Sequence, residues 1–97
     1  MRFELLQASA ILDARAGRAD GARRQVREVT DMMHDGEFLA VAGDAWMTTA
    51  LVERLLGNEK ASDAAVEFAI ELYGRKGAVA LIGHARSWQE ERSASVL

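Results

Sequence analysis

The sequence predicts an all-α fold of about five antiparallel helices, and three observations point to it. The 97 residues contain no proline, and alanine, leucine, arginine and glutamate, all strong helix formers, are abundant. Apolar residues recur with the period of a helix, and glycines separate the periodic stretches. Because the connections are short, consecutive helices should be antiparallel. The expected helices cover about residues 2–16, 19–34, 38–56, 61–74 and 78–92.

The first two helices follow from apolar stripes that each end at a glycine. The first stripe consists of Phe3, Leu5, Leu6, Ile11 and Leu12, and Gly17 stands where a C-cap is expected. In the second helix Asp20 is a possible N-cap, and Gly36 ends the helix. Its buried stripe is expected to contain Ala22, Val26, Val29 and Met33.

The remaining three helices are expected to build the larger part of the core. The third carries Trp46 and Ala50, ends at Gly57, and is interrupted by Gly43 at a cost of about 1 kcal/mol relative to alanine. Ser62 or Asp63 is a possible N-cap of the fourth. The fourth helix should be central because it has a wide apolar face, formed by Ala65, Val66, Phe68, Ala69, Ile70, Leu72 and Tyr73. The fifth begins with the apolar run 78–82.

Composition excludes several classes of protein. The chain has no cysteine, which excludes a disulfide scaffold or a thiolate metal site. A net charge of −3 argues against non-specific nucleic-acid binding. No apolar run approaches the ~20 residues of a membrane span, and an acidic residue, Glu4, follows the N-terminus at once. We therefore expect a single cytoplasmic domain over residues 1–97.

A shift of 40 residues aligns the chain with itself. Identical pairs include Ala10 with Ala50, Gly17 with Gly57, Val26 with Val66, Ala40 with Ala80, Gly43 with Gly83 and Ala45 with Ala85. We interpret this as a helix–turn–helix unit used twice, over about 3–36 and 38–76, with a half-repeat or capping helix over about 78–92. A plain helical bundle is the alternative.

The spacing of these residues resembles the tetratricopeptide repeat family. The second unit contains Trp46, Ala50, Gly57, Ser62, Val66 and Ala69 at the positions where that family has its aromatic, small and glycine residues. The first unit has Leu6, Ala10, Gly17, Ala22, Val26 and Val29 there. The period is 40 rather than 34, as in the divergent, longer repeats of large bacterial regulators.

The resemblance implies a non-catalytic module that binds a protein or peptide, as a regulatory or scaffold piece of a larger system. In such repeats the first helix of each pair lines the concave face. The corresponding side chains are Glu4, Gln7 and Ile11 in the first unit and Asp44, Met47, Thr48, Leu51 and Arg54 in the second. Methionine and leucine with flanking charges suit an amphipathic peptide. Some of these side chains could instead pack against the next helix.

Two pairs and an additional helix are fewer than a stable array needs, because each repeat buries its outer face on a neighbour. The chain is therefore either a piece of a longer array or self-associating, and we expect a homodimer with an apolar interface. The alternative is a small homodimeric regulatory protein without repeats. It would contact its partner through an acidic stripe formed by Asp63, Glu67 and Glu71, a stripe that Arg75 continues at i+4.

The sequence does not predict an enzyme, a metal site or a cofactor. Asp31 and His34 have a spacing that could share a metal, but a polar helix end is the better interpretation. His84 has no acid or serine in a recognisable frame, and no phosphate-binding glycine loop is present. A local basic group (Arg15, Arg18, Arg23, Arg24 and Arg27) is best interpreted as an ion-paired, solvated face.

Overall fold

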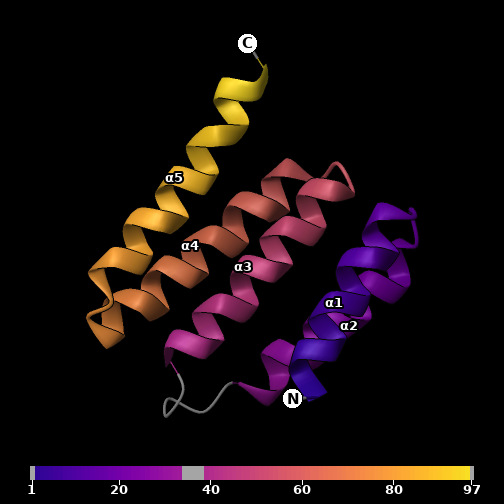
Figure 1. The fold of residues 1–97 in the computed structure, drawn as a ribbon, viewed down its shortest axis with the longest axis horizontal. Coiled ribbons are helices and arrows are strands. Elements are labelled where there is room, and N and C mark those ends of the chain that lie inside the picture. The colour runs from indigo at the N-terminus through magenta and orange to yellow at the C-terminus, as the bar shows by residue number, and fades with distance from the viewer. Residues whose placement is uncertain (1, 34–38, 97) are drawn as a thin grey trace.

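The computed structural model describes residues 2–33 and 39–96, with side chains described over 4–33 and 39–91. These residues form five α-helices and confirm the all-α prediction (Figure 1). The molecule is a flat slab of 36 × 35 × 19 Å. Across it lie α5, α4, α3 and then the α1–α2 pair. The helices are α1 (Arg2–Arg15), α2 (Ala19–Met32), α3 (Leu39–Leu55), α4 (Glu59–Lys76) and α5 (Val79–Val96).

The same glycine turn closes three helix pairs. Gly17, Gly57 and Gly77 have φ angles of 81°, 82° and 76°, a left-handed conformation that glycine adopts without a steric penalty. In each turn the residue after the glycine donates its backbone N–H to the carbonyl of the residue four positions before the glycine. The N–O distances are 2.8 Å, 2.8 Å and 2.9 Å respectively. The predicted helix ends at Gly17 and Gly57 are confirmed. Gly36 lies outside the described residues.

The ends of two helices differ from the prediction. Gly74 lies inside α4, which continues to Gly77, and α5 reaches Val96 rather than ending near residue 92. Asp20 is not the N-cap of α2, because that helix begins at Ala19 directly after the glycine turn. Arg18 holds the N-cap position, and its side chain makes no capping hydrogen bond.

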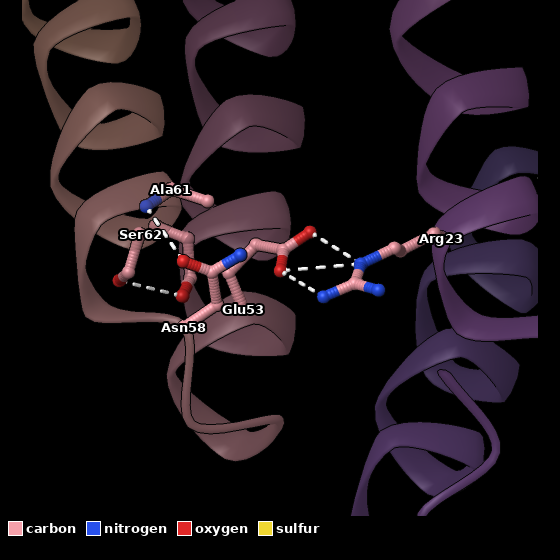
Figure 2. Close-up of polar contacts among 6 residues, drawn as sticks. Arg23, Glu53, Asn58, Ala61 and Ser62 are labelled. Atoms are coloured by element: carbon pink, nitrogen blue, oxygen red, sulfur yellow. Dashed lines mark hydrogen bonds and ion pairs between the residues drawn. The ribbon is translucent and has the colours of Figure 1, made fainter. Parts of the chain in front are cut away.

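The prediction that Ser62 or Asp63 caps α4 is also wrong. Asn58 is the N-cap, and its side-chain oxygen accepts the N–H of Ala61 at 3.2 Å (Figure 2). Ser62 is instead fully buried, and its hydroxyl donates to the Ala50 carbonyl of α3 at 2.8 Å. The small side chain at position 62 thus lies in the contact between α3 and α4.

Close approach also explains the glycine inside α3. A Cβ atom at Gly43 would lie 2.4 Å from Cε1 of Tyr73, so the tyrosine ring of α4 occupies the space where a side chain would be. Further along the two helices, Trp46 stacks on Phe68 with ring centroids 4.8 Å apart. Glycine lowers the helix propensity of α3, but its missing side chain lets the Tyr73 ring of α4 pack against the α3 backbone.

The core consists of two clusters that share α3. Val52 of α3 joins a cluster with α1 and α2 whose other buried members are Ala10, Ala14, Ala22 and Val26. Ala50 of α3 joins a second cluster with α4 and α5 whose other buried members are Ala65, Val66, Ala69, Tyr73 and Ala85. Helix α4 packs against both α3 and α5, as its wide apolar face predicts.

An ion pair joins α2 to α3 (Figure 2). The Arg23 guanidinium of α2 donates to the Glu53 carboxylate of α3, with the closest N–O distance 2.9 Å. This hydrogen bond and the charge of Glu53 raise the pKa of Arg23 above its ordinary value. Glu53 is only 8% exposed, so the arginine supplies the charge that its burial requires.

The acidic stripe on α4 is satisfied within the chain. Glu67 pairs with Arg86 of α5 at 2.7 Å, and Asp63 accepts a hydrogen bond from Gln89 of α5 at 3.3 Å. Glu71 pairs with Arg75 at 3.5 Å, which confirms the i+4 pair. Glu67 and Asp63 therefore serve the contact between α4 and α5, whereas Glu71 pairs within α4. No helix in the described part of the chain is long and apolar enough to cross a bilayer.

Gly43→Ala should lower the free energy of unfolding by about 1–3 kcal/mol, because its methyl group would collide with the buried ring of Tyr73. Gly83→Ala is the matched control, since a Cβ there meets nothing within 4 Å. The control should gain up to about 1 kcal/mol from helix propensity. Urea denaturation followed by circular dichroism measures both, and a Gly43→Ala protein as stable as the control would contradict this packing.

Candidate functional site

A groove of about 560 Å³ lies between α3 and α5, with α4 beneath it. Helix α3 contributes Asp44 and Met47, and α4 contributes Tyr73. The α5 side is formed by Leu81, His84, Ala85, Ser87, Trp88 and Glu91. The volume is typical of a site that holds a small molecule or a few side chains of a partner.

Tyr73 reaches the groove because Gly43 leaves space for its ring. Its hydroxyl donates a hydrogen bond to Oδ1 of Asp44, which stands one residue after that glycine. Burial of the ring raises the pKa of Tyr73 well above its ordinary value of 10.0, and the hydrogen bond to Asp44 and its charge raise it further. The phenol therefore stays protonated and keeps donating to Asp44.

Arg54 and Trp88 connect α3 to α5 beside the groove. The Arg54 guanidinium carbon lies 3.3 Å from the centroid of the Trp88 ring, and the guanidinium donates to the Trp88 carbonyl at 3.1 Å. A cation over an indole face is attracted by the ring quadrupole. This contact fixes the plane of Trp88, which forms part of the groove wall.

The structure brings only some of the predicted binding residues together. Asp44 and Met47 line the groove, and Arg54 lies next to it. Thr48 donates a hydrogen bond to Gln7, so these two join α3 to α1. The remaining three positions are Glu4, which is exposed on α1, Ile11, which packs against the first core cluster, and Leu51, which is half-buried on α3.

The sequence prediction missed the α5 side of the groove, although the 40-residue shift contains the signal. Shifting the predicted positions Asp44, Met47, Thr48 and Leu51 by 40 gives His84, Ser87, Trp88 and Glu91. All four of these α5 residues line the groove. The fifth helix thus presents to the groove the same register positions that the resemblance assigns to α3.

The groove also holds the combination that a catalytic interpretation would need, a histidine in the same site as acids. His84, expected as a surface residue, is exposed and shares the groove with Asp44 and Glu91. In the described residues no hydrogen bond joins His84 to either carboxylate or to Ser87.

Metal ligation is the other chemistry to consider. Within residues 2–33 and 39–96 no three histidine, aspartate or glutamate side chains are grouped to hold a metal ion. The candidate ligand His34 lies outside the described residues. What the described groove offers directly is an apolar wall with acidic side chains at its edge.

No protein-family model, curated protein or solved structure matches this chain closely enough to place it in a family.

The sole tyrosine of the chain makes its ionisation directly measurable. Tyrosinate absorbance should show Tyr73 ionising well above pH 10 in the folded protein. Because its folded pKa is raised, the stability it contributes is complete below pH 10 and declines as the pH rises from there toward the folded pKa.

Tyr73→Phe is the control, since it removes the titrating group and keeps the ring. The wild-type protein should lose more stability in urea than this variant when the pH is raised above 10. Equal losses in the two proteins, or a tyrosinate midpoint near 10, would contradict the buried donor.

Proposed function

We propose that this chain is a non-catalytic module that binds a segment of another protein in the groove between α3 and α5. The observation that carries the proposal is the groove itself. It combines apolar side chains (Met47, Leu81 and Trp88) with polar groups at its edge, the composition of a peptide-binding surface. It also contains Asp44 and Met47, which the family resemblance assigns to partner binding.

We further propose that the module consists of helix pairs of the tetratricopeptide repeat kind. The turns at Gly17 and Gly57 have the same conformation and hydrogen bonds. Three pairs of residues 40 positions apart have the same burial: Ala10 and Ala50, Ala22 and Ser62, and Val26 and Val66 are all at most 4% exposed. Two core clusters that share one helix also suit stacked pairs better than a bundle around one centre. A cytoplasmic regulatory or scaffold role belongs to the same proposal.

Ser87→Tyr should abolish peptide binding, because it places a large side chain in the groove at an exposed position of α5. Peptides are first selected on the wild-type protein from a random displayed library. Their affinities are then measured by titration calorimetry for wild-type and variant proteins. We expect at least a tenfold loss, about 1.4 kcal/mol of binding free energy.

Ala64→Tyr is the matched control, since it places the same large side chain at an exposed helical position of α4 away from the groove. The control should bind like the wild type. Failure to select any peptide, or equal binding by the Ser87→Tyr protein, would refute the groove as the binding site.

We also propose that the chain self-associates through the outer face of α1. Leu5 and Leu12 of this face are 74% and 62% exposed. The residues 40 positions later on α3, Ala45 and Val52, are 2% and 0% exposed. The positions that are buried on α3 are therefore exposed to solvent at the equivalent place on α1. A second copy of the chain would cover this exposed face of α1. The alternative interface, the acidic stripe, is already engaged by Arg86 and Gln89 of α5.

Leu5→Ser combined with Leu12→Ser should convert a dimer into a monomer in sedimentation experiments at micromolar concentration. Removing two leucines from the interface should weaken it strongly, because burying each leucine side chain contributes about 1.5–3 kcal/mol. Val79→Ser is the control, since Val79 is 76% exposed on α5. A wild-type protein that sediments as a stable monomer would rule out self-association.

A further inference from the structure

We propose that the segment bound by the groove is a basic amphipathic peptide, with apolar side chains along one face and lysine or arginine beside them. This inference rests on the proposed function and names the chemistry of its partner. It follows from the charge of the groove, its apolar wall and its length.

The charge at the edge of the groove is negative. Asp44 and Glu91 are the acidic lining residues, and both are exposed to solvent. Tyr73 takes one of the four acceptor positions of the Asp44 carboxylate, which leaves that group able to accept further donors.

Neither of the two nearby arginines of the described chain lines the groove. Arg86 on α5 pairs with Glu67 at 2.7 Å. Arg54 lies flat on the Trp88 ring and is not a lining residue. The groove therefore presents two carboxylates to an incoming segment, in a chain of net charge −3. Electrostatic complementarity then favours a basic partner.

The wall of the groove supplies the apolar half of the interaction. Met47, Leu81 and Trp88 are half-buried, so each keeps part of its surface available for contact. Methionine adapts to different partner side chains because its unbranched chain is flexible and polarizable. Leu81 and Glu91 are ten residues apart on α5, a rise of about 15 Å, which is the length of nearly three helical turns of a ligand.

Three synthetic peptides test the inference. Each has about fourteen residues, the same leucines along one helical face, and either lysine, glutamine or glutamate at the other positions. Binding is measured by the fluorescence of Trp88 in a Trp46→Phe background, where Trp88 is the only tryptophan. Phenylalanine keeps a ring to stack on Phe68. We expect the lysine peptide to bind at least tenfold more tightly than the glutamate peptide, with a smaller difference at high salt.

Glu91→Gln and Asp44→Asn should each weaken binding of the lysine peptide about threefold, as expected for exposed ion pairs. Glu90→Gln is the matched control, since Glu90 is exposed on α5 but does not line the groove. The Glu90→Gln protein should bind the lysine peptide as tightly as the wild-type protein does. Equal or tighter binding of the glutamine or glutamate peptide, or no effect of both acid substitutions, would overturn the basic-partner inference alone. Binding by none of the three peptides, with Ser87→Tyr also without effect on library-selected peptides, would overturn the groove proposal as well.

Discussion

The contact between the Tyr73 ring and the bare backbone of Gly43 is the constraint on which the groove depends. It brings α3 and α4 together more closely than any side chain at position 43 would allow. The same contact places the Tyr73 hydroxyl within hydrogen-bonding distance of Asp44. It also places Tyr73 of α4 in the lining of the groove between α3 and α5. The packing of α3 against α4 and the shape of the groove therefore both follow from the close approach of Tyr73 to Gly43. A helix-weakening residue in the middle of α3 is retained because its missing side chain is what the neighbour needs.

Most of the fold could be predicted because local chemistry determines it. Gly17 and Gly57 end helices since they can adopt positive φ, and the apolar period marks the helix faces. The helix starts were predicted less well. Serine is a common N-cap residue, but Ser62 lies one turn inside α4 and bonds to α3. Whether a serine caps its own helix or bonds to a neighbouring one is decided by tertiary contact. A single sequence does not contain that information.

The candidate site was predicted in part for the same reason. Asp44 and Met47 line the groove because they share a face of α3, which helical periodicity specifies. Ile11 packs against a core cluster and Gln7 bonds to Thr48, since the contact between α1 and α3 takes up that side of the first pair. The α5 wall was not predicted, because the fifth helix was interpreted as a half-repeat or capping helix without binding residues, although its residues occupy the register of α3.

Helix α5 is the weakest anchored wall of the groove, and this determines how the site can open. Ala85 is the only fully buried residue among the described side chains of α5, whereas α4 has five. Elements with few buried contacts detach in local unfolding while the rest of a protein stays intact. Detachment of α5 would remove six of the nine groove-lining residues at once. Binding in the groove and docking of α5 are thus thermodynamically linked. A bound segment would therefore slow amide hydrogen exchange most strongly in α5.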